Sequence, residues 1–429
     1  MSYRNISSSQ WHTTNIPEGV ALTISGAAND NLLVGNYIDP SDPDTNVAIT
    51  GGGTLKFDNA EGYVLVRNGG DSPNQSHATL DLSGLNYFEA AAAGVRVSGD
   101  DDGDGAYRTG TLSLAESNRI DADAVWVGGY AEFGQNSYLY LGQSNDIYTG
   151  AFNVASSEGP GTRGGIGNVS FQEELDNPRV KIRGNSGEDS RANMYVATIN
   201  NGAITNSYLR GYIDFTGGTV DAKLDNLRIG YDNQWSSLWS GGAPFSGSLS
   251  FDSGKVDVNT VVLGRSNGTV GPHGTITVGA DGTLTVGSIT LGQSNGNRAA
   301  TGILNLNGTL EATSVVLGAG GSPAHATATL NFNGGTIRNK VDTDLTISSG
   351  TGSAVTFNLA GASATHTFEA QDGYSISVDS PVTGTGGFTK TGEGTLALSG
   401  DNGYTGNTTV NAGTLTLTHG TSSNTIADS

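Results

Sequence analysis

The feature that most constrains this chain is a short glycine phrase that returns along the sequence at a nearly constant spacing. Leu141-Gly142-Gln143-Ser144-Asn145 recurs unchanged at 291–295 and with one substitution at 263–267. Gly264 and Gly292 are separated by 28 residues, and Gly292 and Gly318 by 26. Such a period is typical of a repeat protein in which each unit packs against the next one. Looser copies stand at Val127-Gly128, Ile229-Gly230 and Leu317-Gly318.

One period contains three short segments in which apolar and polar residues alternate. Between Gly274 and Gly292 these segments are 275–278, 283–286 and 288–291, separated by glycine-rich turns. Strict alternation predicts strands with one inward and one outward face. Three strands in about 27 residues predict one turn of a three-sided β-solenoid, in which each strand pairs in parallel with its equivalent one coil away. Asn-Gly pairs are expected to supply the corners with positive φ; they are Asn267-Gly268, Asn295-Gly296, Asn307-Gly308 and Asn333-Gly334. A sandwich or hairpin array is the alternative explanation of these pairs.

Composition limits the classes that remain. The chain has 429 residues, of which 66 are glycine and none is cysteine, and its formal net charge is -21. Glycine at this level disfavours helices, and no apolar run is long enough to span a bilayer. The excess of acidic residues argues against nucleic acid as a partner and against an anionic membrane surface, whereas cations and neutral sugars fit the charge better. The sequence therefore predicts an all-β chain that does not insert into a membrane.

The last part of the chain closely resembles the autotransporter-associated β-strand repeat, a passenger-associated module of large secreted and surface proteins of Gram-negative bacteria. The residues that carry the resemblance are Gly386–Gly400, Tyr404-Thr405-Gly406 and Thr408–Leu415. The resemblance implies a right-handed parallel β-helix of the pectin-lyase-like type, located extracellularly or on the bacterial outer surface. It also implies a reason for the missing cysteines, because a disulfide would block a passenger that crosses a membrane unfolded. With no signal peptide at Met1 and no anchoring segment after Ser429, we expect a piece of a longer precursor.

No catalytic residues are predicted. Both copies at 264–268 and 292–296 match the G-x-S-x-G nucleophile pattern, but no helix follows them, and we interpret them as corner turns. The main hypothesis is a non-enzymatic, structural or adhesive passenger region. The alternative is a polysaccharide lyase or glycoside hydrolase that acts through the loops of residues 86–245.

Arg179, Lys181 and Arg183 alternate along a predicted strand, so their side chains should share one face. In the lyase hypothesis they would bind an anionic ligand such as a uronate. The other interpretation is that they form ion pairs with nearby acidic residues such as Glu173, Glu174 and Asp176.

Two further sets of residues are binding candidates. Asp100, Asp102 and Asp104 precede or alternate with glycine as in the first half of an EF-hand loop, which predicts a Ca²⁺ site; a solvated acidic turn is the alternative. No other cofactor is expected. Exposed aromatic rings stack on sugars, so a polysaccharide or a host or cell-surface glycan is the predicted partner, with core packing as the alternative. The aromatic candidates are Trp126, Tyr130, Tyr140, Trp235 and Trp239.

The expected organisation is a single β-helix domain over residues 1–429. Residues 1–85 would form the N-terminal cap and first coils, and 86–245 less regular coils with long loops. Residues 246–345 would form regular coils, and 346–429 the C-terminal coils with the recognised repeat. The oligomeric state is left open by the sequence.

Overall fold

The structure of the chain is a computed structural model that describes most of the 429 residues. The described residues are 2–3, 11–27, 30–35, 44–70, 77–98, 107–129, 136–157, 165–199, 209–233, 245–268, 271–295, 298–321, 325–350 and 354–418. They group into two compact units, Met1–Asp225 with Ser236–Gly247, and Asn226–Trp235 with Ser248–Ser429. The organisation as a single domain stays a prediction.

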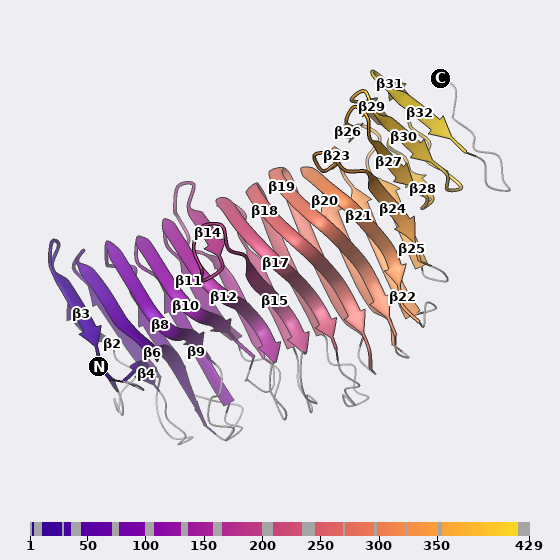
Figure 1. Cartoon of the computed structure of the whole chain (residues 1–429). Coiled ribbons are helices and arrows are strands. Elements are labelled where there is room, and N and C mark those ends of the chain that lie inside the picture. The colour runs from indigo at the N-terminus through magenta and orange to yellow at the C-terminus, as the bar shows by residue number, and fades with distance from the viewer. Residues whose placement is uncertain are drawn as a thin grey trace. The chain divides into compact units, whose positions relative to one another are not determined.

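Every named element of the described residues is a β-strand, which confirms the all-β prediction (Figure 1). The strands of the first unit are β1 (Ser2–Tyr3), β2 (Trp11–Asn15), β3 (Ala21–Ser25), β4 (Leu32–Gly35), β5 (Thr45–Thr50), β6 (Thr54–Gly70), β7 (Ala78–Asp81), β8 (Tyr87–Val97), β9 (Tyr107–Ser113), β10 (Ser117–Val127), β11 (Asn136–Leu141), β12 (Ser144–Ser157), β13 (Ile166–Phe171), β14 (Arg179–Arg183), β15 (Ala192–Ile199) and β16 (Leu209–Asp214). β17 (Thr219–Asp232) and β18 (Phe245–Ser266) contribute residues to both units.

The remaining strands belong to the second unit. They are β19 (Pro272–Ser294), β20 (Ala300–Leu306), β21 (Thr309–Ala319), β22 (Ala326–Phe332), β23 (Gly335–Asn339), β24 (Leu345–Ser349), β25 (Ala354–Leu359), β26 (His366–Glu369), β27 (Ser375–Val378), β28 (Val382–Gly384), β29 (Phe388–Thr391), β30 (Thr395–Leu398), β31 (Thr408–Val410) and β32 (Thr414–Leu417). The described residues contain no helix that is long and apolar enough to cross a membrane.

Within each unit the strands pair in parallel with their equivalents one coil away, as the repeat period predicts. In the first unit β10 lies between β8 and β12, so that Ser117 pairs with Tyr87 on one side and with Ser144 on the other. In the second unit β20 pairs with β22, the first half of β21 with β23, and the second half of β21 with β24. Three parallel ladders per coil confirm the three-sided solenoid and contradict the hairpin array.

The three faces of the first unit can be named in the order in which each coil forms them. The first face consists of β2, β5, β7, β9, β11, β13 and β16. The second face consists of β3, β14 and the N-terminal parts of β6, β8, β10, β12 and β17. The third face consists of β1, β4, β15 and the C-terminal parts of β6, β8, β10 and β12.

Alternating side chains fill the interior, as the sequence pattern predicts. In β20 every second residue from Ala300 to Leu306 is buried. The C-terminal coils of the second unit stack aromatic rings in the same interior. Phe368 makes edge contacts with Phe332 and Phe388, at 5.7 and 5.2 Å between ring centroids, and Phe388 also contacts Tyr404. Such aromatic pairs add to the apolar burial that stabilises stacked coils.

The corner glycines have left-handed backbone, and most of them lie outside the Asn-Gly pairs. Gly264 and Gly292 have φ of 64° and 65°. Among the Asn-Gly pairs, Gly334 has the expected positive φ, at 155°, Gly308 does not, and Gly296 lies outside the described residues. Glycine is required at the corner of Gly264 because successive coils approach each other closely there. A Cβ on Gly264 would lie 2.0 Å from the carbonyl oxygen of Thr301 in the next coil. Ser266 and Ser294 are fully buried, in agreement with the corner interpretation of the G-x-S-x-G matches.

The first unit uses the same corner, at the end of its third face, with glycine in some coils and other residues in others. Gly128 has φ of 71°, and Ser98, Ala155 and Ala197 hold φ of 72°, 50° and 48°. Left-handed backbone at a residue with a Cβ costs roughly 1–2 kcal/mol. Packing of the surrounding coils must offset this strain.

The identical phrase at 141–145 occupies a different corner, between the first and second faces. Here Asn145 is buried, accepts a hydrogen bond from Gly142 N (3.0 Å) and donates one to the carbonyl of Arg179 in the next coil (2.9 Å). Asn118, one coil earlier, donates to Asn145 Oδ1 at 2.9 Å. The loose copies Val127-Gly128 and Leu317-Gly318 are therefore structurally equivalent to the phrases at 263–267 and 291–295, and the phrase at 141–145 is not.

Lys390 is a fully buried cation inside the C-terminal coils. It lies in register between Phe368 and Val410. Its ammonium donates hydrogen bonds to the carbonyls of Thr391, Gly392 and Ala412, at 2.8, 2.7 and 3.1 Å. Burial lowers the pKa of Lys390, and the nearby Glu393 opposes that shift. The ammonium thus joins two successive turns through their main chains.

Candidate functional site

Two tyrosines form an aromatic platform on the outside of the first face. Because side chains alternate along β11, Ser137 and Leu139 point inward while Tyr138 and Tyr140 point outward and are half-buried. Their rings are parallel within 8°, with centroids 5.6 Å apart. We call these two residues the tyrosine platform. Tyr138 was not among the predicted site residues, although its i, i+2 spacing from Tyr140 on a strand could have revealed it.

Small polar residues flank the tyrosine platform on both neighbouring coils. Tyr138 pairs in register with Thr111 and Asn168, and Tyr140 pairs with Ser113 and Ser170. These four side chains are all smaller than the tyrosine rings that they flank. Burial, and then the neighbouring Tyr138 and Glu173, raise the pKa of Tyr140 above its usual value, so its hydroxyl remains a neutral hydrogen-bond donor.

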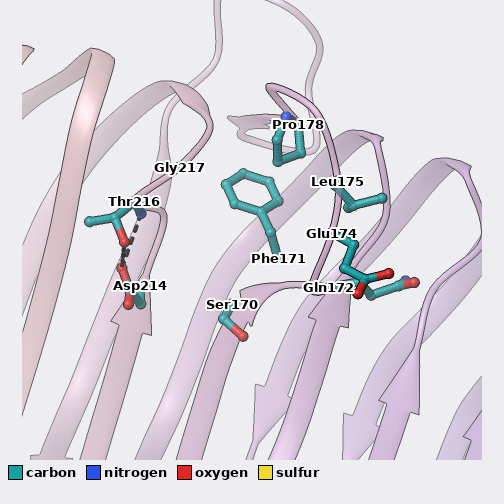
Figure 2. A pocket seen from close by; sticks show the side chains of 9 residues that line it. All are labelled: Ser170, Phe171, Gln172, Glu174, Leu175, Pro178, Asp214, Thr216 and Gly217. Atoms are coloured by element: carbon teal, nitrogen blue, oxygen red, sulfur yellow. Dashed lines mark hydrogen bonds between the residues drawn. The ribbon is translucent and has the colours of Figure 1, made fainter.

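A hollow of about 200 Å³ adjoins the platform where the first face ends. Figure 2 shows Phe171 in its middle, Asp214 and Thr216 on one side, and Gln172 and Glu174 on the other. The hollow and the platform meet at Ser170, which lines the hollow and pairs in register with Tyr140. The complete lining is Ser170, Phe171, Gln172, Glu174, Leu175, Pro178, Asp214, Thr216 and Gly217.

Specific contacts fix the shape of the hollow. Asp214 Oδ1 accepts hydrogen bonds from the backbone N and Oγ1 of Thr216, at 3.0 and 2.7 Å. The side-chain amide of Gln172 donates to the carbonyl of Leu114 at 2.7 Å, and that of Gln143 donates to the carbonyl of Asp176 at the same distance. The loop at 172–178 also holds Glu174 in a left-handed conformation, with φ of 65°. Strain of this kind persists only where the surroundings over-determine the backbone, and it is common at binding sites.

The three cations of β14 lie together on the second face, and each is neutralised. Arg179 Nη1 lies 3.3 Å from Asp146 Oδ1, Lys181 Nζ lies 3.3 Å from Asp146 Oδ2, and Arg183 Nη2 lies 2.6 Å from Asp221 Oδ2. Arg183 is only 5% exposed. Ion pairing agrees with the second interpretation of these residues, but the predicted partners were wrong. The partners come from neighbouring coils or from the loop after β14, rather than from Glu173, Glu174 and Asp176.

Glu188, on the loop after β14, completes this group. Its carboxylate accepts hydrogen bonds from Lys181 Nζ, at 2.7 Å, and from the Tyr148 hydroxyl. These two donors, Lys181 first, lower the pKa of Glu188 to about 2. Burial alone would lower the pKa of Lys181, but hydrogen bonds to Glu188 and Tyr148 and the charge of Asp146 raise it above its usual value. Lys181 is therefore committed to partners within the chain and is poorly suited to bind an external anion.

The same face carries outward charges of alternating sign that stand in register on successive coils. We call this row the charge ladder. It begins with the Lys56–Glu89 ion pair, at 2.7 Å, and ends with Asp221, which stands in register with Lys181. In order, the charge ladder consists of Lys56, Glu89, Arg119, Asp146, Lys181 and Asp221.

Trp126 lies apart from Tyr140, on the third face. The guanidinium carbon of Arg96 is 4.4 Å from the Trp126 ring centroid and 4.7 Å from that of Tyr63. One ring face of Trp126 is thus covered by a cation–π contact, so the structure does not bring this residue to the same site as Tyr140. The other aromatic and metal candidates, Tyr130, Trp235, Trp239, Asp100, Asp102 and Asp104, lie outside the described residues. In the part of the chain that the structure describes, no three His, Asp or Glu side chains are grouped to hold a metal ion.

Comparison with known proteins finds one family match in the C-terminal coils and one short stretch shared with a relative. Residues 388–417 match the family model of the passenger-associated-transport-repeat, which confirms the resemblance seen in the sequence. A stretch of 43 residues is 58% identical to the "Adhesin BmaC autotransporter" of Brucella suis biovar 1 (strain 1330). That stretch covers 10% of this chain and 1% of the relative. No solved structure matches the chain.

Proposed function

We propose that this chain is an adhesive passenger region, displayed outside a bacterial cell, that binds glycans through the tyrosine platform and the adjoining hollow. The passenger repeat at 388–417 and the short stretch shared with a protein named as an autotransporter adhesin support the adhesive role and the location. The single observation that carries glycan binding is the pair of parallel tyrosines beside a hollow that contains an aromatic ring.

The chemistry of the site suits a sugar. A pyranose has an apolar face that stacks on aromatic rings and a rim of hydroxyls that need hydrogen-bond partners. Tyr138 and Tyr140 offer the ring faces. The hydroxyls of Ser170 and Thr216 and the carboxylates of the hollow offer donors and acceptors at its edge. The volume of the hollow is of the order of one sugar residue.

A glycan array probed with the purified chain tests this function. We expect binding to a subset of glycans, with affinity reduced about fivefold or more by Tyr140→Ala, since a lost stacking contact is worth roughly 1 kcal/mol or more. Tyr87→Ala, which removes a half-buried tyrosine from the second face, is the matched control and should bind normally. The proposal would be contradicted if the chain bound no glycan on the array. It would also be contradicted if the Tyr138→Ala and Tyr140→Ala variants bound glycans as tightly as the unaltered chain.

Adhesion itself needs a cellular test. Beads coated with the chain should adhere to target cells, and enzymatic removal of the surface glycans from those cells should abolish the adhesion. Adhesion that survives deglycosylation but is lost after proteolysis of the cell surface would show that the partner is a protein.

A further inference from the structure

The carboxylates around the hollow are not neutralised. Glu174 lies on the loop at 172–178, and Asp214 stands on the other side of Phe171 (Figure 2). Neither carboxylate forms an ion pair with any residue that the structure describes. On the second face, by contrast, carboxylates such as Asp146 and Asp221 lie against cations. The hollow is therefore a local site of negative charge.

Both of these carboxylates belong to the lining itself. Glu174 and Asp214 stand on opposite sides of Phe171, and the lining contains neither lysine nor arginine. An ionised carboxylate only accepts hydrogen bonds. Asp214 uses Oδ1 to accept from Thr216, and its second oxygen takes part in no hydrogen bond with the described residues. The lining thus offers acceptors and negative charge around an aromatic ring.

This combination discriminates among sugars by charge. An ammonium group gains charge-assisted hydrogen bonds from carboxylates and a cation–π contact from an aromatic ring. A uronate or sialate is repelled by the same carboxylates, and the net charge of -21 extends that repulsion beyond the hollow. A neutral or N-acetylated sugar keeps the stacking on Tyr138 and Tyr140 but gains nothing from the two charges.

Building on the proposed glycan function, we infer that the hollow selects amino sugars whose amine is free and protonated. The ammonium of one hexosamine residue lies between Glu174 and Asp214, beside Phe171. A neighbouring sugar ring of the same oligosaccharide stacks on the tyrosine platform. Ser170 lines the hollow and pairs in register with Tyr140, so it connects the hollow to the tyrosine platform.

The test compares three oligosaccharides of equal length by calorimetry: fully deacetylated glucosamine, N-acetylglucosamine and galacturonate. At a pH where the amine is protonated, the deacetylated oligomer should bind at least tenfold more tightly than the acetylated one, and galacturonate should not bind. The preference should weaken with added salt and disappear when the amine is deprotonated.

Two isosteric variants locate the preference. Glu174→Gln and Asp214→Asn should each lower the affinity for the deacetylated oligomer several-fold toward that of the acetylated oligomer. Asp214→Asn retains an oxygen that accepts from Thr216, so the turn is preserved. The control is Glu173→Gln, which removes the same charge from the same loop but outside the lining, and it should leave the preference within twofold.

The remaining outcomes separate this inference from the proposed function. Equal binding of acetylated and deacetylated oligomers that still depends on Tyr140 overturns the amine selection but leaves glycan binding standing. A loss in Glu173→Gln as large as that in Glu174→Gln would mean that only the overall field attracts the ligand, and it overturns the inference. So would a linear polyamine that binds as tightly as the glucosamine oligomer. Binding of no oligosaccharide at all counts against both proposals.

Discussion

Lys181 stands in register with Asp146 on the preceding coil, and its ammonium nitrogen lies 3.3 Å from Oδ2 of that carboxylate. Asp146 also stands in register with Arg119 on its other side. In a parallel solenoid, stacked positions are only about 4.8 Å apart, so repeated identical charges would repel one another along the whole face. Alternation of sign in the charge ladder removes this repulsion and favours one register between coils.

Charge reversal in the middle of the charge ladder should destabilise the chain. Asp146→Lys places a third cation between Arg119 and Lys181, and we expect the free energy of unfolding in urea to fall by on the order of 1 kcal/mol or more at low salt, and by less at high salt. Asp176→Lys, the same charge change in the loop at 172–178, is the control. Exchange of the pair in the double variant Asp146→Lys, Lys181→Asp should not restore stability, because each new charge then meets a like charge on its other neighbour. Full recovery would show that the two residues act as an isolated pair.

The corner at the end of the third face should respond oppositely to two substitutions. Gly292→Ala requires left-handed backbone at alanine and puts a Cβ 2.3 Å from the carbonyl oxygen of Thr327, so we expect a loss of more than about 2 kcal/mol. Ala197→Gly relieves strain at φ of 48°, and it should raise the free energy of unfolding by up to about 1 kcal/mol. The free energies of unfolding of both variants, measured in urea, test these two expectations. A stabilised Gly292→Ala variant would rule out the close approach between coils.

Acid should weaken the contacts of Glu188. Its pKa is about 2 in the folded chain, below the ordinary value of 4.5, so its contribution to stability is complete above about pH 4.5 and is lost as the pH falls toward 2. A carboxyl titration of Glu188 followed by NMR measures this pKa directly. In the Lys181→Met variant the first of its two donors is gone, and the pKa of Glu188 should rise toward the ordinary value. An unchanged titration would assign the shift to other groups.

Removal of the buried cation should loosen the C-terminal coils. Lys390→Met leaves the carbonyls of Thr391, Gly392 and Ala412 without their ammonium donor, and we expect a loss of about 1–3 kcal/mol. Hydrogen exchange should locate the loss in β29 to β32. Lys255→Met, which removes an exposed lysine of β18, is the charge-matched control. If methionine at 390 stabilises these coils, burial of the charge outweighs its three hydrogen bonds.

Much of the fold could be predicted from local patterns, since alternation and a repeat of about 27 residues are properties of short segments. The corner that the phrase Leu-Gly-Gln-Ser-Asn forms could not be predicted in this way. Leu141–Asn145 and Leu291–Asn295 have identical residues but occupy different corners, because Asn145 is held by hydrogen bonds to Gly142 and to the next coil. Position within the coil, and not the phrase itself, decides which corner forms.

The candidate site was harder to predict for the same reason. The hollow joins residues 170–178 to residues 214–217, which are brought together by the pairing of β13 with β16. Likewise Arg179 and Arg183 find partners 33 and 38 residues away, whereas sequence reasoning favoured the closest acidic residues. The outward alternation of Tyr138 and Tyr140 along β11, by contrast, is a local pattern that the sequence shows.

The corner at the end of the third face keeps its left-handed geometry although the number of residues between successive corners varies. From Ser98 to Gly318, successive left-handed residues at this corner are as close as 26 positions, between Gly292 and Gly318, and as distant as 42, between Ala155 and Ala197. Segments of different length thus connect the faces of successive coils while the corner geometry stays the same. The loop beside Phe171 is one such segment, so exchange of that loop alone offers a way to change what the chain recognises without rebuilding its scaffold.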